Sequence, residues 1–439
     1  MQKTVSTEYA TRRRRLMQTL GAGSVAIVAT APMRTRNRDS EYLFRPDSDF
    51  FYLTGFAEPE AVLVLIPGRK EGTYVLFCRE RDPEKETWTG RRAGTEGAKS
   101  RFGADETYPI DEIDEHLPKL LENKHSLYYF VGQDGEVDGH VMEWVNQVRA
   151  KARTGVTAPT KFISLEQHLH EMRLRKSPAE LATMRHAAKV ASEAHVRAMQ
   201  SCRPGMMEYM LEAEMTHTFR HHNCLPAYNF IVGGGENGCI LHYNENDATL
   251  RDGDLVLIDA GAESGYYASD ITRTFPVNGR FTPEQRAIYE LVLRAQLAAI
   301  EKVAPGLHWN EPHDAAVRTL TQGLIKLGLL KGTPAALIKS GDYRKFYMHR
   351  TGHWLGMDVH DVGDYKRDDK WRVFEPGMVL TVEPGLYIAA DTKGVAKKWW
   401  NIGVRIEDDV VVTKSGCEVI TAGAPKTVAD IERLMAKAK

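Results

Sequence analysis

Two carboxylates, Asp259 and Glu383, follow closely similar runs of apolar residues. Each acid stands six positions after one glycine and two before another, in GDLVLIDAG at 253–261 and GMVLTVEPG at 377–385. Runs this short and this rich in Val, Leu and Ile indicate buried strands. A carboxylate inside such a run costs free energy unless a cation or a hydrogen-bond network neutralises its charge. Two such acids on repeated strands therefore predict a shared cation.

Further metal-binding side chains surround these two runs. Asp270 lies in ASDITRT and Glu407 in GVRIEDDV, and both stretches have the pattern of a strand, while His353 lies between glycines in the stretch 349–361. Taken singly, each acid is more often a solvated turn residue, and each histidine a hydrogen-bonded structural one. As a set, four acids on apolar strands and one histidine favour an oxygen-rich metal site with one imidazole.

Two helix starts of the same type precede the acid-bearing strands. Residues 177–180 and 282–285 each combine a capping Ser or Thr, a proline at the first helical position and a Glu or Gln three residues after the cap. Each predicted helix ends near a Pro-Gly pair and is followed by a second helix and one acid-bearing strand. This repeat predicts two related halves packed about a pseudo-twofold axis. Chance recurrence of a helix pattern is the alternative, and the shared Gly-acid-Gly strand makes it less favoured.

The residues before this repeat have the pattern of a separate α/β domain. A chain of 439 residues is too long for one ordinary domain, and the boundary is predicted after residue 172. Within this region the sequence predicts four strands, at 24–29, 61–66, 74–78 and 127–131. It also predicts one clear helix, at 113–121. The aromatic segment 39–56 is predicted to be core rather than a subunit contact. The segment 86–92, with Trp88 near two arginines, is equally compatible with a solvated loop and with an interface.

Composition argues against several classes of protein. The formal net charge is −1 with acids and bases well mixed, so no electrostatic footprint for nucleic acid or an anionic membrane is present. The five cysteines are scattered and form no Cys-x-x-Cys pair, which favours reduced thiols over disulfides or a zinc–thiolate site. No apolar run approaches the length of a membrane span.

Four arginines at 12–15, followed by a short apolar stretch at 24–31, have some features of an export signal. The apolar part is short and is preceded by glycines. A basic amphipathic helix at 7–20, followed by a first strand, is therefore the favoured interpretation, and a cytoplasmic location is expected.

The chain as a whole resembles a known enzyme family. In their order and local context, five residues resemble the metal ligands of the pita-bread metallopeptidases: Asp259, Asp270, His353, Glu383 and Glu407. The stretch GHWLGMDVH at 352–360 resembles the proline-peptidase branch rather than the methionine aminopeptidases. The segments DSEY, DSDF and GCILHY resemble bacterial Xaa-Pro aminopeptidases, the aminopeptidase P family. The resemblance implies a creatinase/prolidase-type α/β domain at 1–172 and an α+β pita-bread catalytic domain with pseudo-twofold halves at 173–439.

The resemblance also implies a cofactor and a set of roles. It implies two divalent metal ions, usually Mn²⁺ with Zn²⁺ or Co²⁺ as substitutes, and a bridging hydroxide that attacks the carbonyl before a proline. Asp259 would be a terminal ligand of one ion, His353 and Glu383 would serve the other, and Asp270 and Glu407 would bridge. Among the remaining implied roles, Glu383 would act as the proton shuttle and His360 would stabilise the oxyanion. His242 and His349 would line the cleft, and Arg405 would be a charge partner of the ligands.

The expected function is that of an Xaa-Pro aminopeptidase, which releases the first residue of peptides with proline second. Two alternatives stay open: a prolidase restricted to Xaa-Pro dipeptides, and a non-catalytic pita-bread binding protein. A metal-free, creatinase-like hydrolase is disfavoured because every ligand position is filled. The resemblance further implies a homodimer or homotetramer, in which the Trp88 segment reaches a neighbouring subunit's site, and no nucleic-acid or membrane partner is expected.

Overall fold

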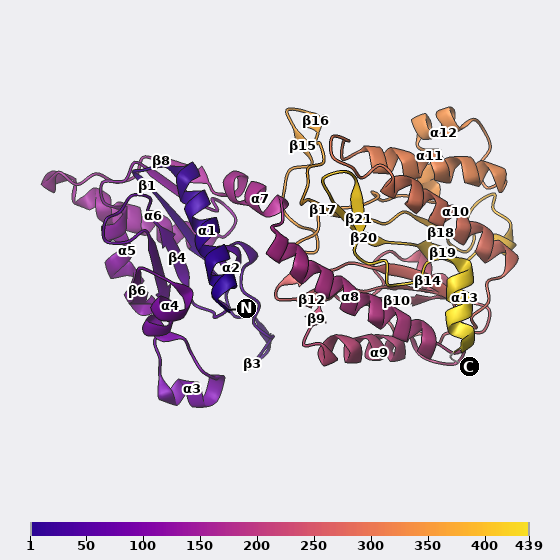
Figure 1. Ribbon diagram of the computed structural model, residues 1–439, viewed down its shortest axis with the longest axis horizontal. Helices are drawn as coiled ribbons and strands as arrows, with labels where there is room; N and C mark the ends of the chain where they lie inside the picture. Colours follow the sequence, from indigo (N-terminus) through magenta and orange to yellow (C-terminus); the bar gives the residue numbers. More distant parts are fainter. Residues whose placement is uncertain (1, 438–439) are drawn as a thin grey trace. The chain divides into compact units, whose positions relative to one another are not determined.

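The computed structural model describes residues 2–437, with side chains from residue 7 onward (Figure 1). The chain divides into two compact units, Met1–Met172 and Arg173–Lys439. No helix within residues 2–437 combines the length and the apolar content that a membrane crossing requires.

The first unit is built on a six-stranded mixed sheet with the order β6-β5-β4-β1-β7-β8. Its central strand β1 pairs antiparallel with β4 and parallel with β7. The strands of this unit are β1 Ser24–Ala29, β2 Thr35–Asn37, β3 Ser40–Glu41, β4 Val62–Leu65, β5 Tyr74–Cys78, β6 Glu106–Pro109, β7 Ser126–Tyr129 and β8 Lys161–Ser164. The helices are α1 Gln2–Leu20, α2 Ser48–Thr54, α3 Pro83–Thr89, α4 Gly94–Phe102, α5 Ile113–Leu121, α6 Gly135–Ala150 and α7 Glu166–Leu174, the last of which ends in the second unit. The predicted strands and the predicted helix are all present, and the bounds of β4 and β7 differ by one or two residues.

The arginine-rich segment is part of this folded unit. Arg12 and Arg13 on α1 are buried, and they donate hydrogen bonds to the carbonyls of Tyr52 and Leu53, at 3.1 and 2.8 Å. The prediction of a helix at 7–20 is therefore confirmed. Buried arginines that satisfy backbone carbonyls hold this helix in place.

Two predictions about this unit need correction. The segment 39–56 was expected in the core, but only its second half is, because α2 buries Phe50 and Leu53 while Leu43 is 76% exposed. The difference arises because residues 35–41 form a two-stranded hairpin with no further partner strand among the described residues. Within the segment 86–92, residues 86–89 belong to helix α3, whose first turn is capped by an aspartate, and only residues 90–92 form the expected loop.

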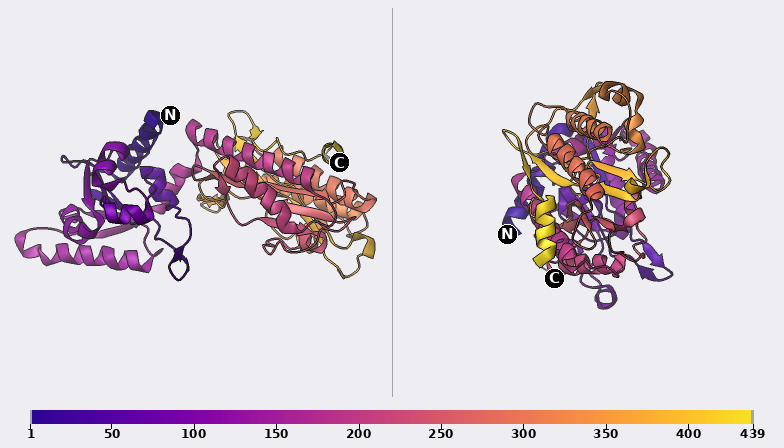
Figure 2. Two further views of the ribbon diagram at one scale, coloured as in Figure 1. Left: turned by 90° about the horizontal axis from the view of Figure 1, so that it is seen from below. Right: turned by 90° about the vertical axis from the view of Figure 1, so that its right-hand side faces the viewer.

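The second unit combines paired helices with several small sheets (Figure 2). Its helices are α8 Pro178–Ser201, α9 Glu208–His221, α10 Pro283–Ile300, α11 Glu311–Lys326, α12 Pro334–Ser340 and α13 Val428–Lys437. Its strands are β9 Leu225–Pro226, β10 Ile231–Gly234, β11 Leu255–Asp259, β12 Ala262–Ser264, β13 Tyr267–Ala268, β14 Thr272–Pro276, β15 Lys366–Arg367, β16 Lys370–Trp371, β17 Val379–Val382, β18 Gly385–Ile388, β19 Ile402–Arg405, β20 Asp408–Val412 and β21 Cys417–Val419.

The repeat predicted from the sequence appears as two helix pairs and two three-stranded sheets. Helices α8 and α9 pack on each other, as do α10 and α11. The sheet β10-β11-β14 carries the first acid-bearing strand and the sheet β17-β20-β21 the second, and both are antiparallel. Alternating apolar residues of these strands meet the helices in one continuous core.

Both repeat helices begin with a complete capping box, at Ser177 and Thr282. We expect Ser177→Ala and Thr282→Ala each to lower the free energy of unfolding by about 1 kcal/mol, because a backbone N–H loses its acceptor. Urea denaturation checks this, with Ser177→Thr as the control that keeps the hydroxyl. Alanine variants as stable as the parent would show that neither cap contributes.

Candidate metal centre and active site

The four predicted acids all lie at strand ends of the second unit. Asp259 is the last residue of β11, whose backbone is paired on both sides by β10 and β14. Glu383 directly follows β17. Asp270 and Glu407 were expected within strands, and this is wrong: Asp270 lies between β13 and β14, and Glu407 between β19 and β20. At both places the chain passes from one sheet to another, so strand pairing is interrupted and the carboxylates turn into the shared space.

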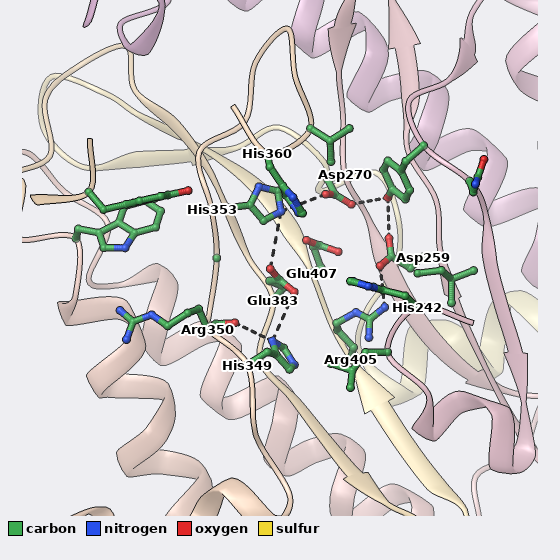
Figure 3. A pocket seen from close by; sticks show the side chains of 18 of the residues that line it. His242, Asp259, Asp270, His349, Arg350, His353, His360, Glu383, Arg405 and Glu407 are labelled. Atoms are coloured by element: carbon green, nitrogen blue, oxygen red, sulfur yellow. Dashed lines mark hydrogen bonds and ion pairs between the residues drawn. The ribbon is translucent and has the colours of Figure 1, made fainter. Parts of the chain in front are cut away.

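His353 meets these acids at the centre of the cleft. Ligand atoms of Asp270, His353 and Glu407 all lie within 4.8 Å of one another. The Nε2 atom of His353 is 3.4 Å from the Asp270 carboxylate and 3.8 Å from that of Glu383 (Figure 3). The Nδ1–H of His353 donates to the Trp354 carbonyl at 3.0 Å, which leaves Nε2 directed toward the acids. This orientation is the one that a metal-binding imidazole needs.

The electrostatics of this cluster call for a cation. Burial raises the pKa of Asp270, and the nearby Asp259 raises it further. Burial, together with Asp270 and Glu383, also raises the pKa of Glu407 well above its ordinary value. Such shifts mean that the carboxylates cannot all be ionised together without added positive charge. Four carboxylates and one imidazole fit a hard or borderline divalent metal ion, and the donor set contains no thiolate.

Arg405 and Tyr228 fix the carboxylate of Asp259. Arg405 on β19 is buried and donates to Asp259 Oδ2 at 2.7 Å and to the Tyr387 hydroxyl at 3.0 Å. The Tyr228 hydroxyl lies 2.6 Å from Asp259 Oδ1 and also bonds Asp270. Burial raises the pKa of Asp259, but Arg405 and Tyr228 outweigh this and keep the pKa below its ordinary value. Arg405, the predicted charge partner, thus pairs with Asp259. Glu407 lies two residues further on, beyond the end of β19, which carries Arg405.

The predicted histidines also face the cleft. The Nδ1–H of His349 donates to the Arg350 carbonyl at 2.7 Å, and this atom is 3.8 Å from the Glu383 carboxylate. Burial lowers the pKa of His349 to about 3, so this ring is neutral at physiological pH. The ring of His360 stands 4.3 Å from that of His353, between centroids, and is exposed.

All of these side chains line one cavity of about 1080 Å³. Every predicted site residue is among its walls: His242, Asp259, Asp270, His349, His353, His360, Glu383, Arg405 and Glu407. Sequence reasoning missed Tyr228, which also lines the cavity. Its only signal is indirect, because it precedes β10, and β10 pairs with β11 so that Ile231 stands opposite Asp259.

A buried ion-pair network holds the turn between His353 and His360, and sequence reasoning missed it too. Asp361 is buried and accepts from Arg173 Nη2 at 2.7 Å and from Lys176 Nζ at 2.8 Å. The backbone N–H of Asp361 donates to the Trp354 carbonyl at 2.9 Å, which closes the turn. A Cβ atom on Gly356 would lie 2.1 Å from Asp361 Oδ2, so only glycine fits there.

Comparison with known proteins decides the family. Residues 182–414 match the model of "Metallopeptidase family M24", and residues 9–129 match "Aminopeptidase P, N-terminal domain". The chain belongs to the M24 metallopeptidase family. This confirms the predicted family and the predicted pair of an α/β N-terminal domain and a pita-bread catalytic domain.

Full-length relatives share this M24 architecture. The Xaa-Pro aminopeptidase of Escherichia coli is 48% identical over 434 residues, covering 98% of each chain. The structure of Pseudomonas aeruginosa aminopeptidase PepP has 59% identity and a TM-score of 0.98, covering 99% of this chain and 98% of the other. A structure of zinc-substituted E. coli aminopeptidase P in complex with product has 48% identity and a TM-score of 0.96, covering 99% of both chains. An M24 enzyme with its acid and histidine set complete is a metallopeptidase rather than a binding protein.

Proposed function

We propose that the protein is an Xaa-Pro aminopeptidase that releases the first residue from peptides with proline at the second position. The observation that carries this proposal is the meeting of all predicted site residues in one cleft of a chain similar to Xaa-Pro aminopeptidases over its full length. The reaction is hydrolysis of the peptide bond that precedes the proline nitrogen.

Five residues would hold two divalent ions, for which we propose Mn²⁺: Asp259, Asp270, His353, Glu383 and Glu407. Their oxygen-rich donor set with one imidazole supports this choice, with Zn²⁺ or Co²⁺ as substitutes. When bound, such a pair supplies an activated water and polarises the carbonyl under attack.

The chain's own residues would move the protons and orient the substrate. Glu383 faces the cleft beside His349, so it accepts a proton from the attacking water and passes it to the leaving nitrogen. His360 is exposed in the cleft and donates a hydrogen bond to the carbonyl oxygen as negative charge develops there. His242 and His349 bound the substrate, and Arg405 keeps Asp259 ionised and in place.

A prolidase, which cleaves only Xaa-Pro dipeptides, would share this chemistry. A cavity of about 1080 Å³ is at the upper end of the range for small-ligand sites, so it holds more than a dipeptide. We therefore expect Ala-Pro-Ala to be hydrolysed with a higher kcat/KM than Ala-Pro. The opposite order would make the protein a prolidase.

Removal of metal tests the cofactor proposal. We expect dialysis against a chelator to reduce hydrolysis of Ala-Pro-Ala to background, because no other group in the cleft can activate water as strongly. Added Mn²⁺ should restore the rate, and metal analysis should find two ions per chain. Full activity after chelation, with no bound metal, would contradict the proposal.

We also propose a homodimer or homotetramer in the cytoplasm, with 1–172 as an assembly domain and 173–439 as the catalytic domain. Trp88, which is 87% exposed on α3, is the contact residue that we propose for this assembly, because aromatic side chains are enriched at subunit interfaces. Support for the location comes from the cysteines, all of which are free. Light scattering of the wild type and of Trp88→Ala tests the assembly, and a monomeric wild type would refute it.

A further inference from the structure

Three residues at one edge of the cleft form a group that the proposed mechanism does not use. Arg350, Lys366 and Trp371 all line the cavity, and we call them the cationic rim. The Arg350 Cζ atom lies 5.2 Å from the centroid of the Trp371 ring, and the Lys366 Nζ atom lies 4.4 Å from it. Lys366 and Trp371 are paired across the β15–β16 hairpin. One indole therefore holds two positive charges at the cavity wall.

Neither of these charges is neutralised. No carboxylate of the described residues lies within ion-pair distance of Arg350 or Lys366, and the Arg350 Nη2 atom donates only to Asn310 Oδ1, at 2.6 Å. Arg405, the third permanent cation of the cavity, differs because it is paired with Asp259. Two like charges against one ring repel each other, and a bound anion would relieve that repulsion. Arginine and lysine donors on the wall of a cleft suit a carboxylate.

The rim lies on one side of the reacting centre. Figure 3 shows Arg350 on one side of Glu383 and Glu407, with its guanidinium directed away from them, and His242 on the other side, beside Asp259. The cation that lies near His242 is Arg405, and its charge is already paired with Asp259 at 2.7 Å. A peptide whose scissile carbonyl lies at the carboxylates extends toward both sides. The ammonium group of the first residue is repelled by the rim, so the residues after the proline run toward it.

We propose that the cationic rim binds a carboxylate carried by the residue that follows the proline. This carboxylate is either the α-carboxylate of a tripeptide or an acidic side chain in a longer peptide. The rim thereby makes short or acidic Xaa-Pro-Xaa peptides the preferred substrates. This inference rests on the proposed function, because it assigns a substrate class to the same cleft.

Binding to an inactive variant tests the rim separately from catalysis. Glu383→Gln protein supplied with Mn²⁺ is titrated calorimetrically with Ala-Pro-Ala and with its C-terminal amide, and then with Ala-Pro-Glu-amide and Ala-Pro-Gln-amide. We expect the free acid to bind about tenfold more tightly than the amide if the α-carboxylate is the ligand. A preference for the Glu peptide over the Gln peptide identifies the side chain as the source instead.

Matched variants assign the preference to the rim. In the Glu383→Gln background, Arg350→Met and Lys366→Met should each reduce the ratio of acid to amide affinity severalfold, and the double variant should bring it close to one. Lys370→Met is the control, because Lys370 is exposed on the same hairpin but does not line the cavity. The preference should also shrink as salt is added, since the rim is exposed.

The outcomes separate the two proposals. Equal binding of every acid and neutral peptide in the Glu383→Gln protein, or a preference that survives both rim substitutions, overturns the rim. If the wild-type protein nevertheless hydrolyses these peptides, the proposed function stands and only the rim proposal is refuted. Wild-type protein that binds the acid tenfold better but hydrolyses none of the peptides keeps the rim and refutes the proposed function.

Discussion

Glu383→Gln should reduce kcat for Ala-Pro-Ala by at least about a thousandfold, because proton transfer by a positioned carboxylate contributes about 10²–10⁴ and the same oxygen atoms are proposed to bind metal. The amide matches the carboxylate in shape but can neither accept a proton from water nor neutralise a cation. The fold should persist, because burial raises the pKa of Glu383 to about 7 and the side chain contributes little favourable charge to folding. Steady-state kinetics with added Mn²⁺ measures the loss.

Glu301→Gln is the matched control for this substitution. Glu301 is exposed at the end of α10 and lies outside the cleft, so its amide variant should keep wild-type kcat and stability. Thermal unfolding of both variants separates loss of chemistry from loss of fold. A Glu383→Gln protein that retains more than about a tenth of the wild-type kcat would remove Glu383 from the proton-transfer role.

Asp361→Ala should lower the free energy of unfolding of the catalytic unit by about 3–5 kcal/mol, because it leaves the buried Lys176 ammonium without its counterion. Both Lys176 and Arg173 are nearly inaccessible, and Lys176 has no other carboxylate partner among the described residues. The nearby Lys176 and Arg173 hold the pKa of Asp361 below its ordinary value, against the effect of burial. The charged form is therefore stabilised on folding, and this contribution is lost as the pH falls toward the pKa of the folded protein.

The same substitution should slow the reaction about ten- to a hundredfold, because His360 loses its fixed place relative to the substrate oxygen. A double-mutant cycle isolates this effect: His360→Ala should cost much less in the Asp361→Ala background than in the wild type. Asp364→Ala, at an exposed position of the same loop, is the control. Additive effects of the two substitutions would show that Asp361 stabilises the fold without positioning His360.

The position of an acid at the end of a strand can be predicted from the sequence where the neighbouring residues alone specify the strand. Asp259 and Glu383 follow apolar runs bounded by glycines, and such runs form strands because both faces are buried. The capping boxes at Ser177 and Thr282 predict the starts of α8 and α10 to the residue, since the cap, the proline and the return hydrogen bond lie within four positions.

Sites that depend on distant contacts could not be predicted from local pattern. At Asp270 and at Glu407 the chain leaves one sheet and enters another. The position of each crossing depends on pairing between strands that are far apart in the sequence. Tyr228 reaches two acids because β10 happens to pair with β11 in one register. Asp361 finds Lys176 across 185 positions of sequence. No periodicity or motif specifies such contacts, because packing of the completed fold decides them.

Product analysis on one longer peptide tests the central claim most directly. Manganese-supplemented protein is incubated with Ala-Pro-Gly-Phe-Lys and, separately, with Ala-Ala-Gly-Phe-Lys, and the products are identified by mass spectrometry. We predict free alanine and intact Pro-Gly-Phe-Lys from the first peptide, and no cleavage of the second. Cleavage of both peptides alike, cleavage at any other bond, or no cleavage of the proline peptide would contradict the assignment.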